Sequence, residues 1–221
     1  MKKFSKWLKR IILTFFISSI GMVLVYKFVP VPVTYLMISR YFASGKLEKT
    51  WTPLNQISKS MQLAVISSED QNFPTHHGFD FDEIQKAIAE QQDGGRVRGA
   101  STISQQTAKN VFLWDGKNFI RKGLEAYFTV FIELIWGKKR IMEIYLNVVE
   151  FGDGIYGAEA AAHHYFGKSA ANLSQAESAS LAALLPNPRK YGQNINGNYI
   201  QKRKAWIMRQ MWNLRDMPMY P

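Results

Sequence analysis

The chain has 221 residues, 47% of them hydrophobic, so it can bury a sizeable core and is not expected to be disordered. It contains no cysteine, which excludes disulfide bonds. The net charge of +11 indicates an anionic partner, but charge alone does not distinguish nucleic acid, acidic phospholipid and a phosphorylated substrate.

The N-terminus has the pattern of a single-pass membrane anchor. Residues 1–10 form a basic tail, and residues 11–29 form an apolar run interrupted only by Lys27. At about 1.5 Å per residue, a helix of this length covers the ~30 Å hydrocarbon core. The positive-inside rule then places the basic tail in the cytoplasm and everything after Pro30 across the membrane. A cleaved signal peptide is the alternative, but its apolar region is usually shorter and ends in small residues.

The rest of the chain is predicted to be a connector followed by one helical domain. Pro30, Pro32 and Pro53 interrupt residues 30–55, which leaves room for one short helix over 35–42. Residues 56–221 have an overwhelmingly helical hydrophobic pattern, so we expect a mainly α domain. The predicted helices cover residues 61–69, 82–92, 101–113, 118–136, 139–149, 157–166, 174–185 and 199–214.

Local patterns add detail to these helices. Ser174 with Glu177 predicts a capping box, and Asp80 with Glu83 offers the same arrangement with a carboxylate cap. The stretch 127–136 is apolar except for Glu133 and belongs either to the core or to a surface in contact with lipid.

Several common sites are excluded by the sequence. Residues 94–101 have the glycine spacing of a P-loop, but Ala100 stands where the lysine is required. The histidines occur as adjacent pairs, at 76–77 and 163–164, and adjacent positions on a helix do not converge on one metal ion. The G-x-S-x-G pattern of serine hydrolases is absent from the sequence.

What remains are carboxylates and cations on segments that are otherwise apolar or rich in glycine. Glu69 and Asp70 end one predicted helix, and residues 101–110 form a dense hydrogen-bonding face. Arg121 lies one turn before Glu125, and such a pair on a surface contributes only about 0.3–0.5 kcal/mol. Each cluster by itself is equally compatible with a solvated helix face.

Taken together, the clusters resemble the signatures of the peptidoglycan glycosyltransferases, glycosyltransferase family 51. Residues 69–80, EDQNFPTHHGFD, match the first signature, E-D-x-x-F-x-x-H-x-G-x-D, at every fixed position. The second signature is resembled by GASTISQQ at residues 99–106. The third, R-K-x-x-E, is resembled by RKGLE at residues 121–125. The fourth is resembled by KKRIMEIYLN at residues 138–147. The likeness extends to Pro186, and the absence of a following transpeptidase domain is typical of the monofunctional members.

The resemblance implies a lysozyme-like multi-helix domain with a membrane-facing jaw at residues 111–117. It implies an enzyme that polymerises lipid II into glycan strands during bacterial cell-wall synthesis, at the inner (cytoplasmic) membrane. Matching the signatures makes Glu69 the catalytic base for the acceptor 4-hydroxyl, and we expect its pKa to be raised. Glu125 matches the second catalytic glutamate, near the donor diphosphate.

The same matching assigns further residues to substrate binding: Asp70, Ser101, Thr102, Gln105, Gln106, Lys109, Lys117, Arg121 and Lys122. Lys117 stands where an arginine is common, and lysine lacks the planar fork that holds phosphate with two bonds. No cofactor is required for certain, and a Mg²⁺ or Mn²⁺ ion held by Glu125 is left open. Glu143 and Asn147 are assigned to packing and helix pairing.

The expected partners are lipid II, the growing glycan strand and the membrane, with other wall-synthesis or division proteins as further candidates and no nucleic acid. Phe112, Leu113 and Trp114 suit either a membrane interface or the core. The basic residues at 202–209 are expected to face water or anionic lipid. A lysozyme-like glycan hydrolase and a non-catalytic membrane scaffold are the alternative functions.

Overall fold

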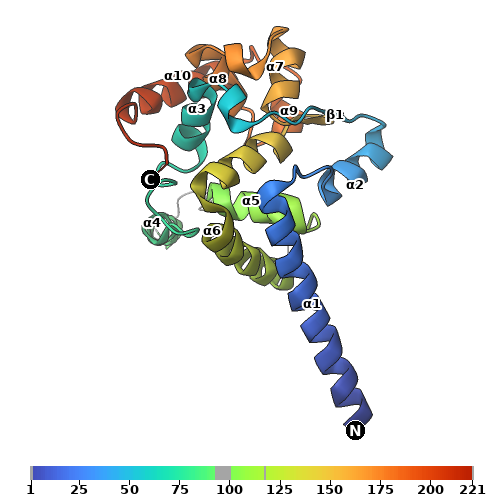
Figure 1. The fold of residues 1–221 in the computed structure, drawn as a ribbon. Coiled ribbons are helices and arrows are strands. Elements are labelled where there is room, and N and C mark those ends of the chain that lie inside the picture. Colours follow the sequence, from blue (N-terminus) through green and yellow to red (C-terminus); the bar gives the residue numbers. More distant parts are fainter. Residues whose placement is uncertain (1, 93–100, 117, 221) are drawn as a thin grey trace.

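The computed structural model describes residues 2–92, 101–116 and 118–220, which are mostly helical (Figure 1). The helices are α1 Lys2–Phe28, α2 Tyr35–Ser44, α3 Lys59–Glu69, α4 Phe81–Gln92, α5 Ile103–Phe112, α6 Phe119–Val148, α7 Ala158–Phe166, α8 Gln175–Ala182, α9 Pro188–Tyr191 and α10 Asn198–Asn213. Single 3-10 turns lie at Leu54–Gln56 and Ala170–Asn172. The prediction of a mainly α chain with an apolar N-terminal helix is confirmed.

The chain also forms a small sheet that the sequence did not predict. Its strands are β1 Glu48–Lys49, β2 Glu150–Gly152 and β3 Ile155–Tyr156, in the order β1-β3-β2. β3 pairs in parallel with β1 and antiparallel with β2. Strands of two or three residues are too short to show an alternating pattern. The sheet ties the predicted connector to the segment that follows α6.

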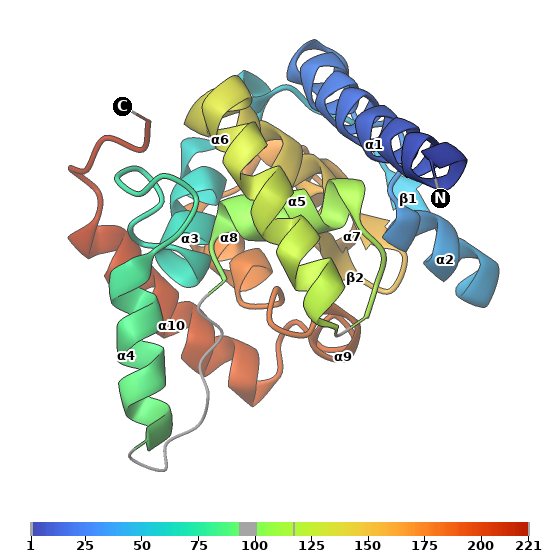
Figure 2. The same cartoon turned by 90° about the horizontal axis from the view of Figure 1, so that it is seen from below.

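The centre of the domain is α5 packed against α6 (Figure 2). On α5, Ile103 and Ala108 are fully buried, and on α6 the same is true of Ile132 and Ile141. α3, α8 and α10 pack against one another beside this pair. The packing therefore brings together segments that carry the second, third and fourth signatures.

The long helix α6 is bent at Gly137, whose φ of 72° and ψ of 166° are not helical. A positive φ favours glycine, and the break agrees with the two separate helices predicted here. Phe128 and Ile132 are buried one turn apart, whereas Leu134 is 77% exposed. The apolar stretch 127–136 therefore has a core face as well as an exposed face.

The residues of the predicted jaw divide between core and surface. Phe112 stacks on Phe128 with ring centroids 4.3 Å apart, and Leu113 is buried. Trp114 is exposed, and so is Phe119 at the start of α6. Phe112 and Leu113 thus pack in the core, whereas Trp114 and Phe119 form exposed apolar surface.

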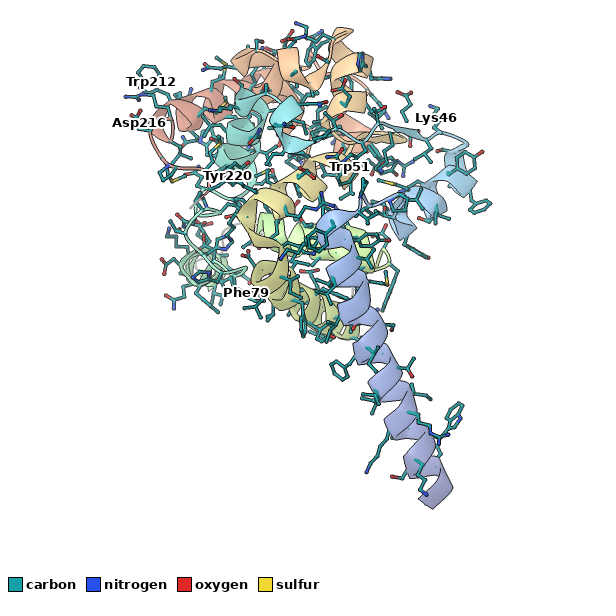
Figure 3. All side chains as sticks on the ribbon, in the orientation of Figure 1. Lys46, Trp51, Phe79, Trp212, Asp216 and Tyr220 are labelled. Atoms are coloured by element: carbon teal, nitrogen blue, oxygen red, sulfur yellow. The ribbon has the colours of Figure 1, made fainter. Side chains whose placement is uncertain are left out.

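Helix α1 is long and apolar enough, over Phe4–Phe28, to span a membrane. Its N-terminal half projects from the rest of the chain, and its side chains point into open space (Figures 1 and 3). Its C-terminal half packs on α6, where the Ser19 and Tyr127 hydroxyls are 2.8 Å apart and Trp136 Nε1 donates to the Val23 carbonyl at 2.7 Å. Because of these contacts, the anchor is part of the fold.

Both predicted caps bond to the helix that follows. Ser174 and Glu177 form a complete capping box at the start of α8. Asp80 accepts from the backbone N–H of Glu83 at 3.0 Å, while the Glu83 carboxylate bonds to Lys86. At the start of α4, the Asp80 side chain thus caps the helix, but the Glu83 carboxylate bonds to Lys86 instead of completing a capping box.

The connector is held to α6 by two of its polar residues. Asn147 Oδ1 accepts from the Thr52 N–H at 2.7 Å, and Asn147 Nδ2 donates to the Thr52 carbonyl at 2.9 Å. The Glu143 carboxylate accepts from the Leu54 N–H at 3.1 Å. These contacts agree with the packing role predicted for Glu143 and Asn147, and they join α6 to the connector.

Replacing Asn147 with Ala should destabilise the protein, because the buried N–H and carbonyl of Thr52 would lose their partners. We expect a loss of roughly 3 kcal/mol, since each unsatisfied buried group costs about 1–3 kcal/mol. Thermal unfolding of the full chain in detergent measures the change. Asn55→Ala, at an exposed position of the same connector, is the control and should unfold like the unchanged protein.

Candidate active site

Glu69 is the last residue of α3, and its position follows from how that helix begins and ends. The Ser58 side chain caps the helix by accepting from the Met61 N–H. Asp70 is the C-cap, with φ −164° and ψ 79°, so the chain turns away immediately after Glu69. The catalytic candidate is thereby placed at a helix end, where its side chain can face neighbouring elements.

The Glu69 carboxylate is bonded on both oxygens. Oε1 accepts from the Ser68 hydroxyl at 3.0 Å, and Oε2 accepts from Gln106 Nε2 on α5 at 3.2 Å. The residue is surrounded by protein but keeps some exposed surface. A carboxylate in this setting can receive a proton from a bound group.

Burial raises the pKa of Glu69 above its ordinary value, and the negative charge of Asp70 adds to the rise. The hydrogen bonds from Gln106 and Ser68 and the positive charge of Arg203 act in the opposite direction. The raised pKa predicted from the sequence is confirmed, with loss of solvation as its main cause. Such a shift suits a general base that works near neutral pH.

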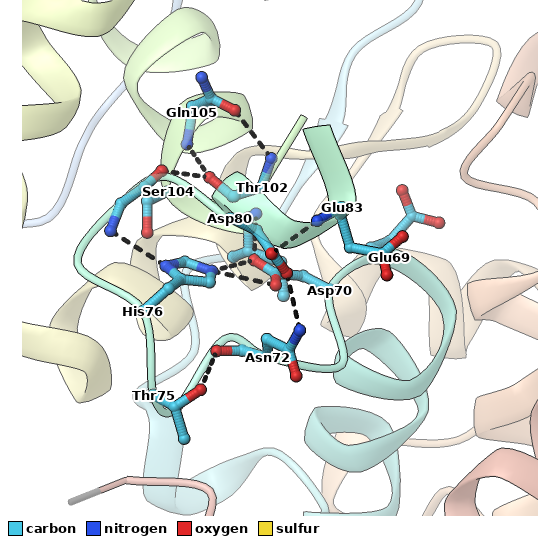
Figure 4. A network of polar contacts seen from close by, with 12 residues as sticks. Glu69, Asp70, Asn72, Thr75, His76, Asp80, Glu83, Thr102, Ser104 and Gln105 are labelled. Atoms are coloured by element: carbon cyan, nitrogen blue, oxygen red, sulfur yellow. Dashed lines mark hydrogen bonds and ion pairs between the residues drawn. The ribbon is translucent and has the colours of Figure 1, made fainter. Parts of the chain in front are cut away.

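Asp70 has a different environment from its neighbour. Its carboxylate accepts from the Ile103 N–H at 2.8 Å and lies 3.0 Å from His76 Nε2 on both oxygens (Figure 4). The Gly78 N–H donates to His76 Nδ1, so His76 carries its proton on Nε2 and donates it to Asp70. The Asp70 side chain is only 2% exposed. This geometry favours a structural role over the predicted contact with substrate.

A buried ion pair continues this network into α6. Lys138 Nζ donates to Glu133 at 2.7 Å and lies 4.6 Å from the centre of the Phe73 ring. The Ser104 hydroxyl bonds to the same Glu133 carboxylate. Lys138 thus links the first, second and fourth signatures, a role that the sequence analysis did not predict.

The start of α5 uses two of the predicted substrate-binding residues for its own capping. The Thr102 hydroxyl accepts from the Gln105 N–H, and the Gln105 side chain accepts from the Thr102 N–H. The Thr102 hydroxyl also donates to the Gly78 carbonyl at 2.7 Å (Figure 4). Both side chains are buried, so they shape the helix that carries Gln106. Ser101, just before them, keeps part of its surface exposed.

Gln106 is oriented by a residue that the sequence did not single out. Tyr145 on α6 donates its hydroxyl to Gln106 Oε1 at 3.1 Å, which leaves Nε2 to face Glu69. Burial and the charges of Glu69 and Asp70 raise the pKa of Tyr145 well above its ordinary value. Its hydroxyl therefore keeps its proton and remains a donor.

Glu125 lies in a cluster of cations at the start of α6. Arg121 donates to Glu125 Oε2 at 2.9 Å, and Lys122 bonds to the other oxygen. The Glu125 side chain is 4% exposed and that of Arg121 11%, so this pair is far from a solvated helix face. Lys122 is half exposed and reaches the cluster from outside.

Lys109 on α5 faces the same cluster across the helix interface. Partial burial lowers the pKa of Lys109, and the nearby charges of Arg121 and Lys122 lower it further, against the effect of Glu125. The residue as a whole nevertheless keeps exposed surface. Lys109, Arg121 and Lys122 together form a basic cluster that exceeds the single negative charge of Glu125. This excess positive charge suits an anionic group such as a diphosphate.

The two carboxylates are connected by one face of α5. Gln106 touches Glu69, and Lys109, three residues later on the same helix, interacts with Glu125. Residues three apart on a helix are neighbours on its surface. The structure therefore brings the predicted base and the predicted cation cluster to adjacent turns of a single helix.

The residues around Glu125 do not by themselves fit a divalent metal ion. Both of its oxygens are bonded to cations, and within residues 2–92, 101–116 and 118–220 no group of three or more His, Asp or Glu side chains converges. Mg²⁺ and Mn²⁺ prefer several oxygen ligands. Glu125 with its two cationic partners is therefore a poor ligand set for such an ion.

Lys117, the remaining predicted substrate-binding residue, lies outside the described residues. The predicted solvated or lipid-facing role of Arg203 is wrong. Its guanidinium donates to the Ser68 carbonyl at 3.1 Å and stands next to the base. No local pattern revealed this, because the contact joins residues 135 positions apart.

A cavity of about 840 Å³ lies elsewhere, between the connector, α3, α6 and the C-terminal segment. Its lining includes Gln62, Glu143 and Tyr220, of which Tyr220 is labelled in Figure 3, and the Tyr220 hydroxyl donates to Gln62 at 2.6 Å. None of the predicted catalytic or substrate-binding residues lines it. Hydrogen bonding and charge, rather than this cavity, identify the active site.

A carboxylate beside one turn of α5 and a cation cluster beside the next are the two kinds of group that sugar transfer from a diphosphate requires. They fit a glycosyltransferase, a class whose reaction needs a base and stabilisation of a charged leaving group. Residues 37–212 match the family described as Transglycosylase, and the chain belongs to this family.

Bacterial proteins named biosynthetic peptidoglycan transglycosylase are similar to nearly the whole chain. The protein from Xanthomonas campestris pv. campestris is 50% identical over 212 residues, which cover 93% of this chain and 86% of that protein. The protein from Xylella fastidiosa is 48% identical over 214 residues, covering 92% of this chain and 88% of that protein. The protein from Pseudomonas fluorescens is 48% identical over 213 residues, covering 94% and 89%.

Replacing Tyr145 with Phe should slow glycan polymerisation roughly fivefold, the effect of losing about 1 kcal/mol from one hydrogen bond. Without the hydroxyl, Gln106 is no longer held with its amide nitrogen toward Glu69. Turnover of lipid II by the purified protein measures the change. Tyr165→Phe, which removes a hydroxyl bonded to the Phe151 carbonyl, is the control and should retain its rate. Equal rates in both variants would contradict the role given to Tyr145.

Proposed function

We propose that this transglycosylase polymerises lipid II with Glu69 as its general base and the basic cluster around Glu125 as its diphosphate site. Family membership supports glycan-strand polymerisation in cell-wall synthesis, with lipid II and the growing strand as substrates. The observation that carries the residue assignments is the placement of Gln106 and Lys109 on one face of α5, where Gln106 donates to the Glu69 carboxylate and the charge of Lys109 interacts with that of Glu125.

The proposed reaction is a single displacement at the donor sugar. The 4-hydroxyl oxygen of lipid II attacks the anomeric carbon of the growing strand, and its proton passes to Glu69. The bond from that carbon to the diphosphate breaks, and the polyprenyl diphosphate leaves with the electron pair. The anomeric configuration is inverted, and no covalent bond to the enzyme is needed.

The diphosphate gains negative charge as it leaves, and nearby cations stabilise this charge. Lys109 and Lys122 keep exposed surface, and Arg121 is held in place by Glu125. Glu125 therefore orders the cluster, because a buried carboxylate between two cations fixes their positions. In this proposal, it does not act as the acid.

The inverting reaction also distinguishes the proposal from a hydrolase. A glycan hydrolase needs an acid to protonate a sugar leaving group, whereas a diphosphate leaves without one. A basic cluster beside the second carboxylate favours the diphosphate. Intact groups for this chemistry also argue against a scaffold without catalytic activity.

We further propose that α1 crosses the inner membrane with the N-terminus in the cytoplasm and the catalytic domain outside. The basic residues at the start of α1 support this orientation. Trp114, Phe119 and Ile120 are exposed apolar residues at or shortly before the start of α6, and they suit contact with lipid. Such contact would place the basic cluster near the diphosphate of a lipid-linked substrate.

Replacing Glu69 with Gln should reduce polymerisation on the order of 10²- to 10⁴-fold, the usual contribution of a general base. The amide keeps the size of the side chain, so the unfolding temperature should change little. Purified protein incubated with lipid II should make long strands and release polyprenyl diphosphate, and shortening of preformed strands would instead favour a hydrolase. Near-normal turnover by the variant would rule out Glu69 as the base.

A further inference from the structure

Arg203 on α10 reaches the end of α3 directly beside the proposed base. Its Nη2 donates to the Ser68 carbonyl at 3.1 Å, and the Ser68 hydroxyl donates to Glu69 Oε1 at 3.0 Å. The last carbonyls of a helix have no partner within the helix, and a cation near them is favourable. Arg203 therefore satisfies a carbonyl in the final turn of α3, one residue before Glu69.

The guanidinium is itself held in place. Its central carbon lies 4.1 Å from the centre of the Trp206 ring, one turn along the same helix. Such stacking restricts the long side chain, because a cation is attracted to the face of an indole. Arg203 Nε is buried without a hydrogen-bond partner among the described residues, so the ring and Ser68 determine its position.

We propose that Arg203 is a positioning residue for the base, which holds the last turn of α3 and favours the ionised form of the Glu69 carboxylate. The inference rests on Glu69 being the base. It assigns α10 a part in catalysis that none of the four signatures contains.

The charges around Glu69 determine the direction in which Arg203 shifts the pKa of this carboxyl group. The titratable groups that face it are Asp70 after α3, Tyr145 on α6, and Tyr199 and Arg203 on α10. Asp70 raises the pKa of Glu69, whereas the positive charge of Arg203 lowers it. Burial makes the pKa of Glu69 high overall, so removing Arg203 should raise it further.

The test compares the pH dependence of polymerisation in Arg203→Gln, Arg203→Lys and the unchanged full-length protein. A base is active when deprotonated, so the rate falls as pH drops through the pKa of Glu69. In Arg203→Gln we expect the acidic limb of kcat to move upward by about half to one pH unit. The rate at the acidic end should then fall roughly three- to tenfold and recover at higher pH. Arg203→Lys keeps the charge, and its limb should stay near that of the unchanged protein.

Arg209→Gln is the matched control, because Arg209 lies exposed on the same helix and carries the same charge. Its pH profile should not move, and thermal unfolding shows whether each variant folds. An unshifted limb in a folded Arg203→Gln, or a change in KM alone, would overturn the positioning role. Glu69→Gln separates the proposed base from the proposed role of Arg203. If this variant retains turnover, the assignment of Glu69 as the base has failed. If it is inactive while the pH profile of Arg203→Gln is unshifted, only the role of Arg203 has failed.

Discussion

The buried carboxylate of Asp70 joins the end of α3 to the beginning of α5. A charge removed from water must find hydrogen-bond donors, and Asp70 finds them in the Ile103 N–H and in His76. These bonds hold the first residue of α5 and the turn after α3 against each other. Glu69 precedes Asp70 directly, so its carboxylate takes a fixed place against Gln106. The position of the base thus depends on the neighbour that stays buried.

In pairs of adjacent polar residues at the site, one residue stabilises the fold and the other faces the proposed base. Gln105 closes the capping box of α5, while Gln106 faces Glu69. Successive residues on a helix point about 100° apart, so one of the pair turns inward and the other toward the base. This division explains why a dense run of polar residues begins α5.

Much of the fold could be predicted from the sequence, because helices of ten residues or more show a clear period. The sheet could not be predicted, because β1 and β3 are each two residues long. For the site, Glu69 and Glu125 emerged from the resemblance, since a carboxylate at a helix end is usually solvated. Tyr145 and Arg203 bond to partners 39 and 135 positions away, and no local pattern records such contacts.

The packing of α1 on α6 has a consequence for how the enzyme moves. Ser19, Val23 and Tyr26 bond to α6 at successive turns of α1, so the two helices form one stiff unit. A domain on a loose tether would swivel and sample many heights above its anchoring point. With α1 in the membrane, as proposed, the tilt and depth of this helix would be transmitted directly to α6. The reach of the active site would then be determined by the orientation of α1 and not by diffusion of the domain.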